Sequence, residues 1–200
     1  YESNVDSLGI YDKDLLPASF HKMNRKKVRA LMPESTMAIY YAGTEKVISN
    51  DVSYEFHQDP DFYYLTGLNE PISVLFLFKE PTVFKNDTVH ELLLLKKRNP
   101  LSEVWVGKKL GVEGSELILD MEKSYDIDQF AWVDLSVDQV DSLFFHDPQK
   151  EFRNKSLIND SILQHMIIDN KESRKWMDQL REIKTEEEMT LMRPWQYYML

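Results

Sequence analysis

Apolar residues in the first part of the chain recur at a helical spacing and then in a strand-like run. Ser19, shortly after Pro17, can cap a helix that Pro33 ends. The apolar positions of this predicted helix fall close to helical spacing: Phe20, Met23, Val28 and Leu31. Residues 36–43 are rich in β-forming side chains, which predicts a strand buried on both faces.

Two longer apolar runs predict a hairpin of central strands. They span 73–79 and 89–97, and the segment between them offers turn chemistry at Pro81 and at Asn86-Asp87. The following stretch, 101–114, alternates apolar and polar residues and then meets three glycines. It predicts a short strand or an extended segment that leaves the sheet through a loop.

Helical spacing returns in the second half of the chain. Residues 114–135 predict a helix, with Ser124 or Asp126 as its N-cap. The run 142–147 predicts another strand, and 157–167 predicts an amphipathic helix.

The last elements are helical as well. Residues 173–183 predict a helix that places Trp176, Leu180 and Ile183 on one stripe. Together with the earlier elements, this order predicts an α/β domain in which helices flank a mixed central sheet.

A capping box marks the start of one more helix. Thr185 supplies a hydroxyl for a free backbone amide, and Glu188 can reach back to the Thr185 amide. Pro194 removes a helix donor and allows no more than another turn. The ending 194–200 therefore suggests a truncated or altered sequence, as if a second domain had been removed.

Composition narrows the classes of function. The formal net charge of −10 argues against a general nucleic-acid surface, because phosphate binding uses clustered Lys and Arg. The basic runs 22–29 and 96–100 are predicted as the solvated face of a helix and the polar end of a strand, with phosphate binding as the alternative. The chain has no cysteine, and its longest apolar runs are strand-sized, which predicts no membrane span.

Local motifs supply little catalytic chemistry. Gly107, Gly111 and Gly114 fit neither a Walker loop nor a dinucleotide fingerprint, and no serine lies in a G-x-S-x-G elbow. The 34 acidic residues indicate a solvated surface rather than a particular acid-base pair. The histidines lack neighbouring ligands at metal-binding spacing and are predicted to be structural or superficial: His21, His57, His90, His146 and His165.

Three ordered motifs nevertheless resemble one family. The segment FHQDPDFYYLTGLNEPISVLFLF (56–78) resembles the N-terminal domain of Xaa-Pro aminopeptidase, also called aminopeptidase P, of the creatinase and prolidase superfamily. SEVWVGKKLG (102–111) and LREIKTEEEMTLMR (180–193) resemble the family's Trp-bearing segment and the helix that opens its catalytic domain. The resemblance covers about residues 18–193. The first motif matches at these positions: Phe56, His57, Gln58, Asp61, Phe62, Tyr63, Tyr64, Gly67, Asn69, Glu70 and Pro71.

The resemblance implies a ribonuclease-H-like domain without chemistry of its own. In the family, two metal ions, usually manganese, lie in a C-terminal "pita-bread" domain, so we expect no catalytic residue and no metal ligand in these 200 residues. The expected partners are that catalytic domain, further copies in a homo-oligomer and, in the full-length protein, proline-containing peptides. No nucleic acid and no membrane is expected. The chain alone should be inactive.

The same resemblance divides the chain into three parts. Residues 1–17 are predicted to be a weakly ordered tail, 18–183 the aminopeptidase P N-terminal domain, and 184–200 the linker and first helix of the catalytic domain. A cytoplasmic protein is expected, with export after removal of a signal peptide as the alternative.

Two groups of residues are candidates for substrate access or an oligomer interface, namely Glu103, Trp105, Gly107, His57, Gln58, Asp61 and Tyr64. Trp105 is the foremost of them, since in the family the Trp-bearing loop approaches a neighbouring subunit's active site; the alternative is a tryptophan buried at a strand end. For the other group, which lies in the segment 56–71, two roles are considered, a structural role in packing the domain and direct contact with substrate. The structural reading places four aromatic rings beneath the sheet: Tyr54, Phe56, Phe62 and Tyr64.

Two other functions stay open at this point. One is a protein-interaction module from a superfamily member without peptidase activity. The other is a free-standing hydrolase, which would need acids or histidines that converge from distant parts of the chain.

Overall fold

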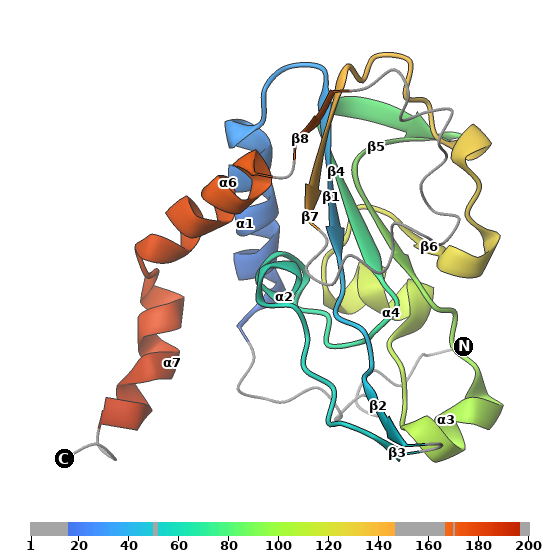
Figure 1. The fold of residues 1–200 in the computed structure, drawn as a ribbon, viewed down its shortest axis with the longest axis vertical. Helices are drawn as coiled ribbons and strands as arrows, with labels where there is room; N and C mark the ends of the chain where they lie inside the picture. Colours follow the sequence, from blue (N-terminus) through green and yellow to red (C-terminus); the bar gives the residue numbers. More distant parts are fainter. Residues whose placement is uncertain (1–15, 50–51, 147–166, 170, 197–200) are drawn as a thin grey trace.

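A six-stranded mixed sheet lies at the centre of the molecule (Figure 1), in the order β6-β5-β4-β1-β7-β8. The computed structural model describes residues 16–49, 52–146, 167–169 and 171–196. The strands of this sheet are β1 Thr36–Tyr41, β4 Val74–Phe84, β5 Asp87–Leu95, β6 Ser124–Asp126, β7 Ser142–His146 and β8 Ile167–Asp169.

Helices flank the sheet, and the predicted α/β architecture is confirmed. The helices are α1 Ala18–Leu31, α2 Pro60–Thr66, α3 Pro100–Val106, α4 Gly111–Ile118, α6 Glu172–Glu182 and α7 Glu186–Gln196. A separate two-stranded sheet is formed by β2 Val47–Ser49 and β3 Val52–Ser53. Within the described residues, no helix is long and apolar enough to cross a membrane.

All strands of the central sheet except β4 run in one direction. β1 is parallel to β7, β7 to β8, and β5 to β6, whereas β4 is antiparallel to both of its neighbours. The carboxyl ends of the parallel strands therefore lie at one edge. Figure 1 shows α3 and the β2–β3 hairpin at that end of the molecule. Segments that leave the carboxyl edge of a sheet are common sites of ligand contact.

Both faces of the sheet are covered. Along β1, Ala38 and Tyr40 pack into a core shared with α1, α2, α4 and α6. The alternate residues Met37, Ile39 and Tyr41 pack into a second core, which residues 127–140 close on the other side. The prediction that this strand is buried on both faces is confirmed.

The predicted hairpin is also confirmed, with a tighter turn than expected. β4 continues to Phe84 and pairs with β5 at Asp87, so the reversal takes only two residues. The first of these, Lys85, has a positive φ of 53°. The long strands continue through the segment that had been assigned to the turn because Phe84 and Val89 face the second core.

Helix α1 begins differently from the prediction. Its N-cap is Pro17, which makes no side-chain hydrogen bond, so Ser19 lies inside the first turn. Two of the four predicted apolar positions are not buried, since Met23 is 53% and Leu31 is 37% exposed. The stripe that faces the core contains Arg25 instead, which is fully buried.

The segment 101–114 contains the end of α3 and the start of α4, joined by the loop 107–110, so the prediction of a short strand or an extended segment is wrong. The Asn99 side chain accepts a hydrogen bond from the Leu101 amide at 3.1 Å, and Pro100 occupies the first helical position. Both features favour the start of a helix. The apparent alternation arose because α3 is short and its apolar side chains face solvent.

The helix predicted over 114–135 is mostly absent. α4 ends at Ile118, and Ser124 begins strand β6 rather than capping a helix. Asp126 does act as an N-cap, but of a single 3₁₀ turn at 127–129. Strand β6 forms here because its backbone completes the edge of β5.

The C-terminal elements follow the prediction more closely. Strand β7 and helix α6 are confirmed, although Ile183 lies beyond α6 and is 79% exposed. In the capping box, the Glu188 amide donates to Thr185 Oγ1 at 3.3 Å, and the Thr185 amide donates to Glu188 Oε2 at 2.9 Å. Most of the helix predicted over 157–167 lies outside the described residues.

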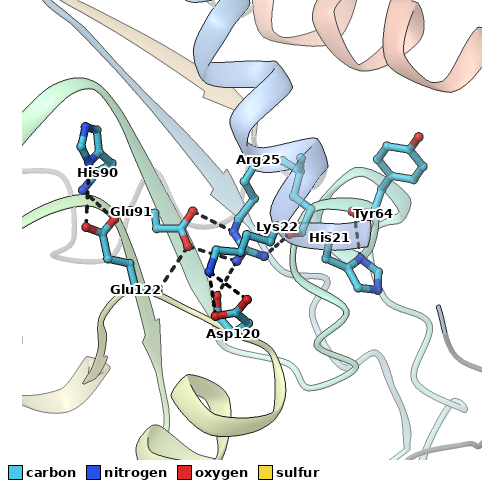
Figure 2. Close-up of polar contacts among 9 residues, drawn as sticks. His21, Lys22, Arg25, Tyr64, His90, Glu91, Asp120 and Glu122 are labelled. Carbon is cyan, nitrogen blue, oxygen red and sulfur yellow. Dashed lines mark hydrogen bonds and ion pairs between the residues drawn. The ribbon is translucent and has the colours of Figure 1, made fainter. Parts of the chain in front are cut away.

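One buried ion pair fastens α1 to the sheet (Figure 2). Arg25 Nε and Nη2 donate to the two carboxylate oxygens of Glu91 on β5, at 2.8 and 3.0 Å. The remaining guanidinium bonds go to the carbonyl oxygens of Leu65 and Asp120, both at 2.9 Å. The side chains of Arg25 and Glu91 are 0% and 4% exposed. The prediction that 22–29 forms a solvated helix face therefore fails at Arg25.

A second contact fixes α2 beside α1. His21 Nδ1 donates to the Tyr64 carbonyl at 3.0 Å (Figure 2), and burial lowers the pKa of His21 below 6.5. Gly67 ends α2 with a φ of 70°. A Cβ at this position would lie 2.8 Å from the His21 ring. Both the left-handed conformation and the close ring therefore require glycine here.

Removal of the buried cation should be far more harmful than removal of a neighbouring exposed one. Arg25→Ala should lower the free energy of unfolding by about 3–5 kcal/mol, because the Glu91 carboxylate would stay buried without its partner. Lys22→Ala, which breaks the exposed ion pair with Asp120 on the same helix, should cost less than about 1 kcal/mol. Urea unfolding measures both. Equal losses for the two variants would contradict this account.

Candidate functional site

The predicted site residues fall into two groups at the carboxyl edge of the sheet. One group lies on or just after α3, and the other lies in or just before α2. The segments that follow these helices are joined, because the Leu110 amide donates to Glu70 Oε1 at 2.6 Å. Glu70 is buried, so this bond fixes the loop after α3 to the segment after α2.

The α3 group presents an apolar surface to solvent. Leu101, Val104 and Trp105 are 83%, 78% and 88% exposed. The alternative in which Trp105 is buried at a strand end is therefore wrong. Glu103 pairs with Arg98 through two hydrogen bonds of 2.9 and 2.8 Å, which fix the first turn of α3 against the preceding strand exit.

Gly107 ends α3 and has a φ of 80°. No atom would lie within 4 Å of an added Cβ. The glycine is therefore required by the turn of the chain and not by a close neighbour.

Gln58 acts as a bridge between three stretches of backbone. Its side-chain oxygen accepts from the Gly43 amide at 2.6 Å and from the Asp59 amide at 2.9 Å. Its side-chain nitrogen donates to the carbonyls of Leu68 and Glu70, at 3.0 and 2.9 Å. All hydrogen-bonding capacity of the carboxamide is thus used within the fold.

The aromatic residues before and within α2 separate into two sets. Phe62 and Tyr64 are buried in the core, as predicted. Tyr54, however, is 60% exposed, and Phe56 is only half-buried, so the prediction that all four rings pack beneath the sheet is wrong. Exposed His57 lines an open cleft of about 480 Å³ together with Tyr54.

Asp61 belongs to a charged cluster that the sequence did not reveal. His146 Nε2, at the end of β7, lies 3.4 Å from Asp59 Oδ1 and 3.6 Å from Asp61 Oδ2. Arg181 on α6 donates to Asp61 Oδ1 at 2.6 Å. The side chains of Asp59 and Asp61 are only 7% and 13% exposed, so the cluster joins three elements in a poorly solvated place.

Opposing effects act on the protonation of His146. Burial lowers the pKa of its imidazole, but the hydrogen bond with Asp59 and the charges of Asp59 and Asp61 outweigh burial and Arg174, so that the pKa is raised above 6.5. The adjacent Tyr40 ring is 5.8 Å away. Burial and then the charge of Asp61 raise the pKa of Tyr40 as well. The cluster therefore favours a protonated His146 beside a neutral phenol.

Tyr64 joins the same region to α6. Its hydroxyl donates to the Leu180 carbonyl at 3.3 Å. Burial and the Glu188 carboxylate raise the pKa of Tyr64 to about 12, against the opposing effects of Arg181 and Asn24. The phenol is therefore neutral and acts as a donor rather than as a base.

The polar groups of Gln58 and Asp61 are hydrogen-bonded or paired within the fold. Among the residues that the structure describes, no group of three or more His, Asp or Glu side chains could hold a metal ion. Convergent charges do occur at His146, the last residue of β7, and no local pattern in the sequence indicated them.

Most of this chain is similar in sequence to known Xaa-Pro aminopeptidases. The Xaa-Pro aminopeptidase of Haemophilus influenzae is 32% identical over 177 residues, which cover 88% of this chain and 40% of that protein. Human Xaa-Pro aminopeptidase 3 is 29% identical over 121 residues, or 55% of this chain and 23% of that protein. The chain thus spans less than half the length of these curated relatives.

Solved structures share the fold. Proline aminopeptidase P II from Yersinia pestis superposes with a TM-score of 0.72 at 24% identity, over 90% of this chain and 42% of that one. Aminopeptidase P from Escherichia coli with the inhibitor Pro-Leu gives 0.71 at 21% identity, with the same coverage. The family model described as "Aminopeptidase P, N-terminal domain" matches residues 21–135, more than half of the chain. This chain therefore belongs to the aminopeptidase P N-terminal domain family, as an N-terminal domain of Xaa-Pro aminopeptidase-like proteins.

Proposed function

We propose that this chain is the non-catalytic N-terminal half of an Xaa-Pro aminopeptidase, a metallopeptidase that removes the residue preceding a proline. Two manganese ions and the catalytic groups are assigned to a C-terminal catalytic domain. Family membership supports this assignment, as does the 40% share of the Haemophilus influenzae Xaa-Pro aminopeptidase that the chain matches. In that arrangement, this domain contributes to assembly of a homo-oligomer and to the access of proline-containing peptides.

The exposed apolar surface of α3 is the observation that carries the role in assembly and access. Three large apolar side chains lie exposed on one seven-residue helix, at Leu101, Val104 and Trp105. Clusters of this kind are typical of contact surfaces, and tryptophan is enriched among the residues that dominate binding energy. Glu103 and Gly107 position the helix, and Trp105 makes the proposed contact.

The charged cluster formed by Asp59, Asp61, His146 and Arg181 has a different proposed role, which is to hold the connection to the catalytic domain. Arg181 on α6 and Tyr64 on α2 both reach across the boundary between these helices. Asp61 on α2 forms ion pairs with Arg181 on α6 and with His146 on β7, so its one carboxylate links all three elements. We assign Asp61, Gln58 and Tyr64 to positioning of the helices, not to contact with the peptide.

Activity should require the catalytic domain. The purified 200-residue chain supplied with manganese should give no measurable hydrolysis of an Xaa-Pro peptide, since its described residues hold no group suited to a metal. The full-length protein, assayed alongside, should hydrolyse the peptide. Turnover by the chain alone would overturn the assignment, and an inactive full-length protein would favour the interaction module.

Substitution of the exposed tryptophan should separate function from folding. In the full-length enzyme, Trp105→Ala should change kcat/KM for Xaa-Pro peptides or weaken the oligomer, while the free energy of unfolding changes by less than about 0.5 kcal/mol, because the side chain is 88% exposed. Peptide kinetics, analytical ultracentrifugation and urea unfolding measure the three effects. A large loss of stability with unchanged kinetics and assembly would refute this role.

Protonation of His146 should make stability depend on pH. Because the folded-state pKa is raised above 6.5, the stabilising contribution is complete below pH 6.5 and is lost as the pH rises through the folded-state value. The free energy of unfolding should therefore decline above pH 6.5, and His146→Gln should flatten this decline. His90→Gln, at a side chain that is 41% exposed, is the matched control and should leave the decline in place. An unchanged pH profile in His146→Gln would contradict the role of the cluster.

A further inference from the structure

The segment 99–110 forms a loop whose two ends meet. It leaves the sheet after β5, contains α3 and returns to the body at the start of α4 (Figure 1). Arg98 lies directly before the segment, and Gly111 lies directly after it. The stem of the Arg98 side chain packs closely against the glycine, since an added Cβ on Gly111 would lie 2.4 Å from Arg98 Cγ. Arg98 therefore holds the entry of the segment beside its exit.

The guanidinium of Arg98 extends this contact to α3. Its Nε and Nη2 donate to the two carboxylate oxygens of Glu103, at 2.9 and 2.8 Å. Two parallel bonds of this kind fix the orientation of the partners as well as their distance. The hydrogen bonds from Arg98, and to a smaller extent one from the Lys109 backbone amide, outweigh burial and hold the pKa of Glu103 below its usual range. The Arg98–Glu103 pair thus joins the entry of the segment, the first turn of α3 and the returning loop.

The orientation of α3 depends on these polar contacts because three of its large apolar side chains do not anchor it. Leu101, Val104 and Trp105 are 83%, 78% and 88% exposed, so they bury little surface against the body. A helix of seven residues is also too short to be stable alone, since isolated helices below about 12–15 residues are marginal in water. Contacts at the ends of the segment therefore set the direction in which α3 presents Trp105.

The exit of the segment has a second, independent attachment. The Leu110 amide donates to Glu70 Oε1 at 2.6 Å, and both residues are buried. This bond does not involve Arg98. Loss of the Arg98–Glu103 pair should therefore release α3 while Leu110 and α4 keep their places, so the effect of the pair can be separated from general unfolding.

We propose that Arg98 is a positioning residue for the contact made by α3. It holds Trp105 in the orientation that meets the partner surface, and it acts through Trp105 rather than through a contact of its own. A preformed surface loses less conformational freedom on binding, which strengthens the contact. This inference rests on the proposed role of α3 in assembly and access, and it adds to that role a residue that lies outside the helix.

Backbone dynamics of the 200-residue chain test the positioning directly. Arg98→Met keeps an unbranched stem against Gly111 but has no guanidinium. Nuclear magnetic resonance relaxation should show rigid amides at 101–105 in the unsubstituted chain, with order parameters of about 0.85, and a fall below about 0.6 in Arg98→Met. The amides of 112–118 in α4 should stay rigid in both. Lys97→Ala, which removes an exposed cation from the adjacent position, is the matched control and should leave the order parameters unchanged.

A double-mutant cycle in the full-length protein tests whether Arg98 acts through Trp105. Arg98→Met alone should lower kcat/KM for an Xaa-Pro peptide, or raise the dissociation constant of the oligomer, by about threefold or more. In the Trp105→Ala background it should have no further effect, because substitutions that act through one contact are not additive. A merely structural residue would instead give additive effects. If Arg98→Met does not fold, Glu103→Gln breaks the same pair from the other side and replaces it in both experiments.

Three results would overturn the inference. They are unchanged order parameters in Arg98→Met, an equal loss of order in Lys97→Ala, and additive effects of Arg98→Met and Trp105→Ala. Each can occur while Trp105→Ala alone weakens function, in which case the proposed role of α3 stands and only the positioning role of Arg98 fails. If Trp105→Ala alone changes neither assembly nor kinetics, the proposed role of α3 fails, and the positioning role fails with it.

Discussion

The arrangement of helices over one face of the sheet depends on the buried ion pair between Arg25 and Glu91. Through this one guanidinium, α1 is fixed to β5, to the end of α2 and to the loop at residue 120, all of them distant in sequence. A buried charge must keep its partner, and each remaining donor must find an acceptor. The pair therefore defines which surfaces meet, and hydrophobic burial then supplies most of the stability.

The common direction of the parallel strands brings the candidate residues to the carboxyl edge of the central sheet. The two groups then differ in how they are held. The carboxamide of Gln58 makes hydrogen bonds with the backbone, and the carboxylate of Asp61 accepts a hydrogen bond from Arg181. The apolar residues of α3 instead face solvent, although Glu70 fixes the loop that follows them through the Leu110 amide. A rigid framework thus presents a free contact surface, which is the combination that recognition requires.

Sequence patterns identified the four longer strands of the central sheet and the family, because those signals are local, whereas the short strand β6 was taken for helix. Runs such as 36–41 and 89–95 contain apolar residues on both faces, and the motif at 56–78 is long and ordered. The helix α3 was missed because three exposed apolar residues on two turns resemble the alternation of a strand. Asn99 followed by Pro100 was the signal that could have corrected this.

Other features could not be found in the sequence because they arise from tertiary contact. Nothing local distinguishes Arg25 from the solvated lysines beside it, since its partner is 66 residues away. The same holds for His146, which meets Asp59 and Asp61 only after β7 and α2 have packed together. Polar pairing between residues distant in sequence produces no periodic pattern, so the cluster around His146 was not predicted.

The contact between Gly67 and His21 also constrains how this domain can diverge. Since the imidazole ring occupies the space that a Cβ at position 67 would need, a larger residue at position 67 is incompatible with His21. A relative that carries a larger residue at the end of α2 must have a smaller one at the position of His21, and must find another donor for the Tyr64 carbonyl. The two positions, 46 residues apart, should therefore change together in evolution.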